Sequence, residues 1–277
     1  MREREVSAYL CAVLLLVAAG PASAGITGQW DFDDPANGLK ATVGADLQAV
    51  GVAATDSQWG TTTELGIPDI GGVPARVMKF PKMPTSNDGY KMWPGAAANG
   101  STGDVNQYTL IMDILFPAAS SGKWRSLFQT SASNSNDGDF FVRAGDNGIG
   151  ISGVYHGAIL PDTWHRVALV VDLEQPEGQP DYFKYIDGVL VGSQNVGTPG
   201  GRFSVWPAES GNPSWLFSDE DGETELGYVN SVQFRDYAMT ADEILALGGP
   251  TAAGIPEPAT LAMVGLGLAT MARRRRR

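Results

Sequence analysis

Short runs of β-branched and aromatic residues recur along the chain, separated by clusters of Gly, Asn, Asp and Pro. Runs of this length between turn residues predict the strands of an all-β sandwich or barrel. The predicted strands cover residues 26–32, 76–80, 108–116, 124–129, 140–143, 148–152, 164–172, 182–187, 189–192 and 227–235. The 35 glycines and 17 prolines suit a turn-rich chain. Long amphipathic helical patterns are nearly absent, so the predicted fold class is all-β.

Two local motifs predict a hairpin and a helix in the C-terminal half. Asp187-Gly188 separates two apolar runs and predicts a two-residue hairpin, because a type I′ turn needs positive φ, which Gly adopts freely. Thr240 stands three residues before Glu243, which is the spacing of a capping box. A short helix is therefore predicted over 241–247, and Gly248 ends it.

The N-terminus has the pattern of a secretion signal. A charged start precedes an apolar run over residues 8–19, and Ala22 and Ala24 follow as small residues at a cleavage site. The apolar run is shorter than the ~20 residues that a membrane span needs. We expect cleavage after Ala24, which makes residues 1–24 a signal peptide.

The C-terminus combines a Pro-Glu-Pro tripeptide, an apolar stretch over 259–272 and five terminal arginines. These features together resemble the PEP-CTERM sorting signal, with sorting residues Pro256, Glu257, Pro258, Arg273, Arg274 and Arg275. The resemblance implies that an exosortase cuts near the tripeptide while the tail is held in the inner membrane of a Gram-negative bacterium that makes exopolysaccharide. The 14 apolar residues are short for a stable span, and the arginines stay on the cytoplasmic side, so a transient anchor helix is expected.

These ends divide the chain into a signal peptide (1–24), one body (25–250), a small-residue linker (251–254) and a sorting tail (255–277). Without Arg2, Arg4, the five C-terminal arginines and three glutamates at the ends, the body keeps 12 basic and 28 acidic residues, a net charge of −16. Such a body repels nucleic acid and attracts cations such as calcium. Cys11 is the only cysteine, so the mature body has no disulfide.

Several motifs of the body look like laminin G-like domains of the concanavalin A-like superfamily. They are Trp30-Asp31-Phe32, Trp164-His165-Arg166-Val167-Ala168, the Asp187-Gly188 hairpin and the segment 228–244. The resemblance spans most of residues 25–250. It implies a two-sheet antiparallel jelly-roll sandwich, which agrees with the strand pattern.

Acidic loops are the best candidates for chemistry. Residues 219–225 hold five acids in seven positions, and Asp221, Glu223 and Glu225 would share one face of an extended chain. Calcium prefers such oxygen ligands, and a solvated acidic loop explains the pattern equally well. The candidate calcium ligands are Asp219, Asp221, Glu223, Glu225, Asp137 and Asp139. The last two belong to a second acidic loop, over 134–139.

Trp206 and Trp215 flank the first acidic loop and are candidate stacking residues for sugar rings. His156 and His165 do not form a catalytic triad, so no catalytic residue is assigned. We therefore expect a non-catalytic module that binds carbohydrate or protein, with exopolysaccharide or a surface glycan as partner. A purely structural matrix protein is the nearest alternative. A glycoside hydrolase using Glu223 or Glu225 is less favoured, because the order of the alternating acids is wrong.

Overall fold

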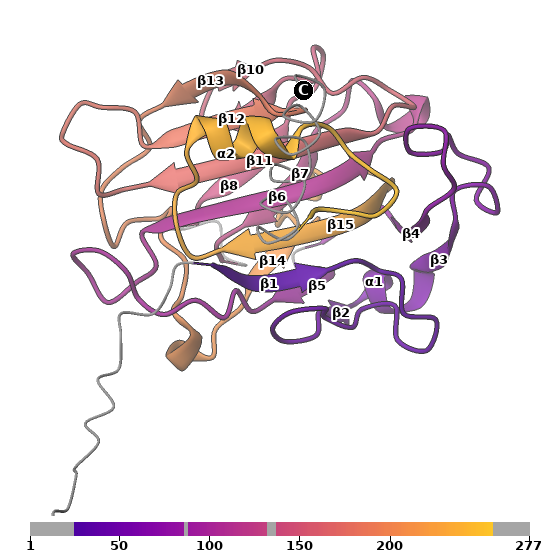
Figure 1. The fold of residues 1–277 in the computed structure, drawn as a ribbon, viewed down its shortest axis with the longest axis horizontal. Helices are drawn as coiled ribbons and strands as arrows, with labels where there is room; N and C mark the ends of the chain where they lie inside the picture. Colours follow the sequence, from indigo (N-terminus) through magenta and orange to yellow (C-terminus); the bar gives the residue numbers. More distant parts are fainter. Residues whose placement is uncertain (1–24, 86–87, 132–136, 257–277) are drawn as a thin grey trace, which may run out of the picture.

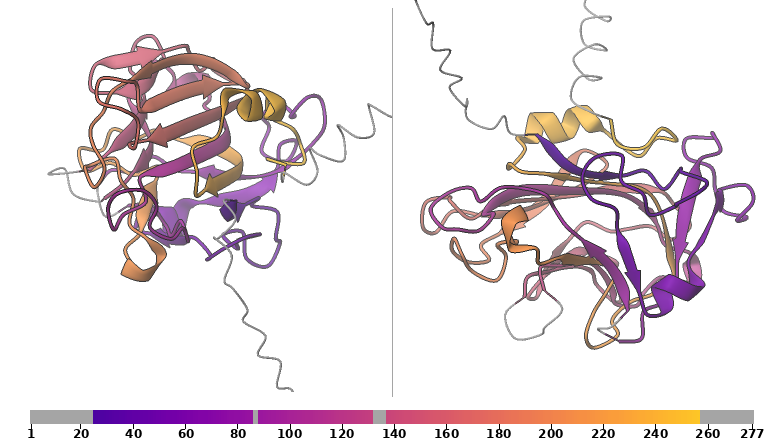
Figure 2. Two further views of the ribbon diagram at one scale, coloured as in Figure 1. Left: turned by 60° about the vertical axis from the view of Figure 1, so that its left-hand side comes forward. Right: turned by 90° about the horizontal axis from the view of Figure 1, so that it is seen from below.

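The computed structural model describes residues 25–85, 88–131 and 137–256, which fold into two antiparallel sheets packed face to face (Figures 1 and 2). The all-β sandwich predicted from the sequence is confirmed. Residues 1–24, where a signal peptide with Ala22 and Ala24 at its cleavage site is expected, and tail residues 257–277 lie outside the described part.

Sheet A has eight strands. They are β1 (Ile26–Trp30), β3 (Gln58–Thr61), β4 (Arg76–Phe80), β6 (Gln107–Leu115), β11 (His165–Asp172), β12 (Tyr182–Ile186), β13 (Val189–Gln194) and β15 (Gly227–Arg235). Their order is β13-β12-β11-β6-β15-β4-β3, and β1 pairs with β15 beside this row. Both long central strands, β6 and β15, are buried along nearly their whole length.

Sheet B has seven shorter strands. They are β2 (Gln48–Val50), β5 (Gly89–Met92), β7 (Arg125–Gln129), β8 (Asp139–Val142), β9 (Ile149–Ile151), β10 (Val154–His156) and β14 (Ser214–Leu216). Their order is β10-β9-β8-β7-β14-β5-β2. Four short helices complete the described part: α1 (Val52–Asp56), η1 (Ala118–Ser120), η2 (Ala208–Ser210) and α2 (Ala241–Leu247).

The predicted hairpin and helix are confirmed. Asp187 and Gly188 both have positive φ, 52° and 83°, as a type I′ turn requires. The Thr240 hydroxyl accepts a hydrogen bond from the Glu243 amide, and the Glu243 carboxylate accepts one from the Thr240 amide. This capping box starts α2 at the predicted residue.

Both faces of sheet A are buried. Its inner face packs against sheet B in the main core, around buried side chains such as Trp30, Tyr108 and Phe128. Its outer face carries a second apolar cluster under α2, made of Ile111, Ala168, Val170, Tyr185, Met239, Ile244, Leu247 and Ile255. Helix α2 therefore belongs to the outer face of sheet A, opposite sheet B (Figure 2).

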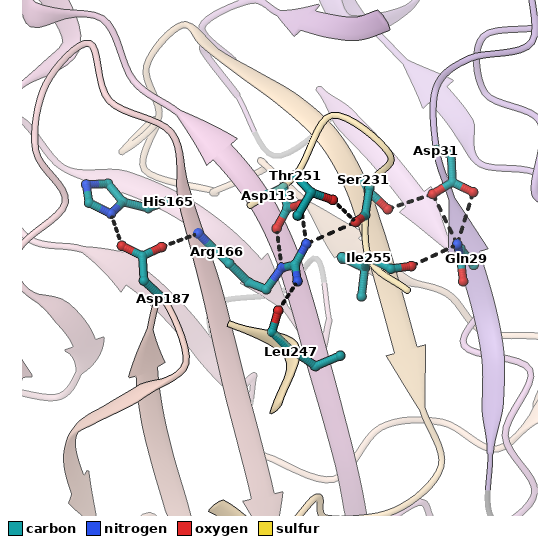
Figure 3. A network of polar contacts seen from close by, with 11 residues as sticks. Gln29, Asp31, Asp113, His165, Arg166, Asp187, Ser231, Leu247, Thr251 and Ile255 are labelled. Atoms are coloured by element: carbon teal, nitrogen blue, oxygen red, sulfur yellow. Dashed lines mark hydrogen bonds and ion pairs between the residues drawn. The ribbon is translucent and has the colours of Figure 1, made fainter. Parts of the chain in front are cut away.

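Residues 248–256, which we call the C-terminal strap, are held against this outer face (Figure 3). The buried Arg166 guanidinium donates to both carboxylate oxygens of Asp113, each at 2.7 Å, and to the carbonyls of Leu247 at 2.8 Å and Gly254 at 3.0 Å. The Gln29 amide donates to the Ile255 carbonyl at 3.4 Å. Residues 251–254, which are expected to form a linker, are therefore held against the body, where the buried Arg166 guanidinium donates to the Gly254 carbonyl.

Neither α-helix in the described residues is long and apolar enough to cross a membrane. The apolar segment 259–272, for which an anchor helix is expected, lies outside the described part.

Candidate functional site

One row of side chains crosses four strands of sheet B on the face that points away from the core. Lys91 on β5 pairs with Trp215 on β14, Trp215 with Gln129 on β7, and Gln129 with Asp139 on β8. Residues next to these in sequence lie in the main core: Tyr90, Leu216, Phe128 and Phe140. Because side chains alternate along a strand, the row lies on the outer face of sheet B.

Trp215 is a buried member of this row. Its side chain is only 7% exposed, and the Lys91 ammonium stands 5.4 Å from the centre of its ring. An ammonium over an indole face is a stabilising cation–π contact. The ring face that a sugar would need is thus covered by lysine.

Trp206 lies in a different environment and faces an open hollow. It is 44% exposed, which makes it the only exposed tryptophan of the seven, all of which are described. It lines an apolar hollow of about 280 Å³ together with Trp93, whose indole N–H donates to the Gly211 carbonyl at 2.9 Å. The other lining residues are Ala45, Pro94, Gly95, Pro207, Ala208 and Asn212. Trp206 therefore shares its hollow with Trp93. Trp215, the other candidate stacking residue, is not among the residues that line the hollow.

The two predicted acidic loops meet at the Asp139 end of the row. The Gln129 amide donates to Glu220 at 2.6 Å and lies 3.5 Å from Asp219. Burial and the neighbouring Asp137 carboxyl raise the pKa of Asp139 to about 8, and Arg202, 3.4 Å away, opposes this rise. Burial also raises the pKa of Glu220, with a smaller contribution from Asp137 and Asp219. The structure thus brings Asp137, Asp139, Asp219 and Glu220 into one cluster, which we call the acid cluster.

The remaining acids of residues 219–225 are divided among other partners. One oxygen of Asp219 accepts the amide N–H groups of Asp221 and Glu223, which closes the loop on itself. Glu225 forms ion pairs with Lys82 at 3.0 Å and Lys123 at 3.1 Å. The expected shared face of Asp221, Glu223 and Glu225 does not form, because residues 219–222 make a turn instead of a strand.

Three buried oxygens in and beside the acid cluster have no hydrogen-bond partner: Asp137 Oδ2, Asp139 Oδ1 and Gln129 Oε1. They are oxygens of the kind that calcium prefers. Across the described ranges, however, no three His, Cys, Asp or Glu side chains are arranged to hold a metal ion. The donor set suits calcium chemically, and its side chains would have to rotate to surround an ion.

Most of the predicted sorting residues at the C-terminus lie outside the described part. Pro256 is the last described residue, and the structure does not describe Glu257, Pro258 or the arginines at 273–275. Residues 134–136 of the second acidic loop also lie outside the described part.

Residues 254–277 match the family model of the PEP-CTERM protein-sorting motif. This tail identifies the chain as an exported protein that an exosortase processes, with transient anchoring at the membrane before the protein reaches the cell surface. A comparison with curated protein sequences finds no similar protein.

Solved structures share the sandwich fold at low sequence identity. Domain 4 of AbnA, an extracellular arabinanase from Geobacillus stearothermophilus solved with arabinotriose, is 17% identical at a TM-score of 0.50, with 81% of this chain and 98% of that domain covered. Trypanosoma rangeli sialidase with sialic acid is 12% identical at a TM-score of 0.50, with 79% of this chain and 32% of that chain covered. The binding domain of Paraclostridial Mosquitocidal Protein 1 is 10% identical at a TM-score of 0.50, with 80% and 51% covered. The chain thus spans about a third of the sialidase and half of the mosquitocidal domain, and these similarities establish the fold alone.

Proposed function

We propose that the body is a non-catalytic carbohydrate-binding module that attaches an exported, exosortase-processed protein to a surface or matrix polysaccharide of a Gram-negative bacterium. The observation that carries the proposal is the exposed Trp206, which lines an apolar hollow together with Trp93. Sugar rings present apolar faces to aromatic side chains and hydroxyls to polar ones.

Trp93 lines the hollow and follows Lys91 by two residues, so it lies on the same side of sheet B as the polar row that begins at Lys91. Stacking at one end and hydrogen-bonding groups along the row would suit an extended glycan. The arabinotriose complex of the arabinanase domain supports this choice of ligand class.

The arrangement of the acids favours binding over hydrolysis. A retaining glycosidase needs two free carboxyl groups about 5–5.5 Å apart. Glu225 is held between two lysines, and Asp221 lies in the turn over residues 219–222, so the expected alternation of Asp221, Glu223 and Glu225 along a strand is absent. The proposed module is therefore non-catalytic, and an assay for hydrolysis tests this.

The test is affinity electrophoresis of the mature protein in gels that contain arabinan or purified bacterial exopolysaccharide. Trp206→Ala should raise the dissociation constant obtained from the retardation about tenfold or more, which is equivalent to a loss of about 1.4 kcal/mol or more of binding free energy. Leu160→Ala, a change at an exposed leucine outside the hollow, is the matched control and should migrate like the parent.

Three results would overturn the proposal. Equal retardation of the parent and Trp206→Ala would show that Trp206 does not bind the sugar. Failure of every polysaccharide to retard the parent would favour a purely structural matrix protein. Release of reducing sugar that Glu223→Gln abolishes would favour a glycoside hydrolase.

We propose further that calcium strengthens this site through the carboxylates of Asp137, Asp139 and Glu220. Asp219 serves its own loop and Glu225 its lysines, so these two are weaker candidates than the sequence suggests. Burial and, after it, repulsion from Asp137 raise the pKa of Asp139, and a divalent ion would neutralise that repulsion. Proton and calcium would then compete for the acid cluster.

A further inference from the structure

The C-terminal strap fixes the point at which the chain leaves the body. Ile255 is only 1% exposed and packs with Leu247 and Val170 in the cluster under α2. The Arg166 guanidinium holds the carbonyls on both sides of the strap turn, and Thr251 donates its amide N–H to Asp113 (Figure 3). Gly254 has a φ of 76°, and an added Cβ would lie 3.1 Å from Asp31 and Ser231, so glycine is needed for this close seat. The strap is part of the folded body up to residue 255.

Only the tripeptide Pro256-Glu257-Pro258 separates this fixed point from the apolar segment 259–272. A peptide spans at most about 3.3–3.6 Å per residue, so the four Cα steps from Ile255 to Ala259 reach roughly 14 Å. This distance is shorter than the thickness of the body, because two packed sheets alone are about 10 Å apart before their outer side chains and α2 are added. A body tethered so closely cannot turn its opposite side, sheet B, toward the bilayer.

We infer that the outer face of sheet A, with α2 and the strap, lies against the lipid head groups while the tail is in the membrane. The inference rests on membrane retention of the tail, which the sorting motif implies, and is independent of carbohydrate binding. The partner is the bilayer that holds the protein's own tail.

The surface of this face is compatible with an interfacial position. Leu245 on α2 is the most exposed large apolar residue of the described part, at 60%, and Leu190 on β13 is 49% exposed. Leu190 lies opposite Tyr185, which packs under α2, so both leucines belong to the same side of sheet A.

Helix α2 on this face carries acidic residues, so the contact with the bilayer depends on the tether and not on electrostatic adsorption to the lipid head groups. Helix α2 carries Asp242 and Glu243 in its first turn and no basic residue in its last turn. Acidic side chains are repelled by anionic lipids. We expect the contact to vanish once the tail is cut, which leaves the processed body free of the membrane.

This orientation directs the acid cluster away from the cell. The row that leads to the acid cluster lies on the outer face of sheet B, whereas α2 and the strap cover the outer face of sheet A (Figure 2). The tethered protein would thus present the sheet B side to the surroundings before its release.

Single-cysteine labelling can test the orientation, because the mature chain has no cysteine of its own. Residues 25–277 are placed in phosphatidylethanolamine–phosphatidylglycerol vesicles that contain a spin-labelled lipid quencher. An environment-sensitive fluorophore is attached at Leu245→Cys, or at Glu209→Cys beside the hollow as the matched control. We expect at least twofold stronger quenching at position 245 than at position 209.

The decisive variant carries a 12-residue Gly-Ser insertion between Ile255 and Pro256. Such a linker adds about 20 Å of reach and should abolish the difference between the two positions. Thermal unfolding of each labelled protein in detergent checks that the body is folded. Equal quenching at both positions in the parent, or a difference that survives the insertion, would overturn the inference. Neither outcome depends on whether the body binds polysaccharide.

Discussion

The Asp139 carboxyl group shows how a residue acquires chemistry from partners far away in the sequence. Asp137 is its near neighbour, but Glu220 and Arg202 arrive from other loops, and burial has the largest effect on its pKa. The sequence indicates acidic loops at 134–139 and 219–225 and predicts cation binding at each. It does not predict that they form one cluster, because the pairing of β7 with both β8 and β14 brings them together.

The raised pKa of Asp139 predicts a pH-dependent stability. Its ordinary value is 3.8 and its value in the fold is about 8. The folded state therefore holds a proton that the unfolded chain releases, so this group's contribution to stability is lost as pH rises from about 4 to about 8. Asp139→Asn cannot ionise and should raise the free energy of unfolding at pH 8 by on the order of 2 kcal/mol, or about 4–8 °C in Tm.

Thermal unfolding without calcium at pH 5 and pH 8 measures this effect. The gain should be clearly smaller at pH 5, and the exposed control Asp56→Asn should show little change at either pH. A variant that is equally stabilised at both pH values would contradict the assigned cause.

At the scale of elements, predictability follows length and local sequence pattern. Long runs such as β6, β11 and β15 were predicted within a residue or so of their ends, and the Thr240 capping box located α2. Five strands of three or four residues were missed: β2, β3, β5, β10 and β14. So short a strand has little readable period of its own, although β8 and β9 were found from the runs 140–143 and 148–152, and the missed strands are defined by pairing with a neighbouring strand. Lys91, on β5, was missed as a neighbour of the site for the same reason.

The buried pair of Arg166 and Asp113 predicts how the strap is held. Arg166→Leu leaves the Asp113 carboxyl buried without its cation and should lower the free energy of unfolding by about 3–5 kcal/mol. The second change Asp113→Leu should recover much of this loss, because no buried charge remains.

Denaturant unfolding of the two single variants and the double variant gives the coupling between the residues. Arg143→Leu, which breaks an exposed ion pair with Asp146, is the matched control and should cost less than about 1 kcal/mol. If the loss of unfolding free energy in the double variant equals the sum of the two single losses, Arg166 and Asp113 are not coupled. The proposed role of this pair in holding the strap would then be wrong.

At the scale of the whole molecule, the two sheets have different surroundings. Sheet A is covered by α2 and the strap, whereas sheet B carries the polar row and adjoins the hollow at Trp206. The sequence supports the fold class and the sorting tail because both rest on patterns within continuous segments. The different surroundings of the two sheets depend on the pairing register of the strands and on the position of the strap against sheet A. No single segment of the sequence specifies either of these.

Calcium should stabilise the whole fold if it bridges the two acidic loops. At a hundred times its dissociation constant it adds about 2.7 kcal/mol, or roughly 5–11 °C in Tm. The increase over a chelator control should be larger at pH 8 than at pH 6, because the ion must displace the proton of Asp139. It should disappear in Asp139→Asn and persist in Glu225→Gln, whose carboxylate is paired with lysines. A shift that persists in Asp139→Asn would place the ion elsewhere.

The pairing of β1 with β15 has a consequence for the order of folding. Ile26 lies opposite Arg235, so the first described strand closes against the last. This closure needs both residues on the same side of the membrane, and contacts so distant in sequence form slowly. The 23 residues 236–258 separate β15 from the apolar tail segment. Sheet A can therefore be completed only once β15 has joined β1, when few residues of the body remain before the tail.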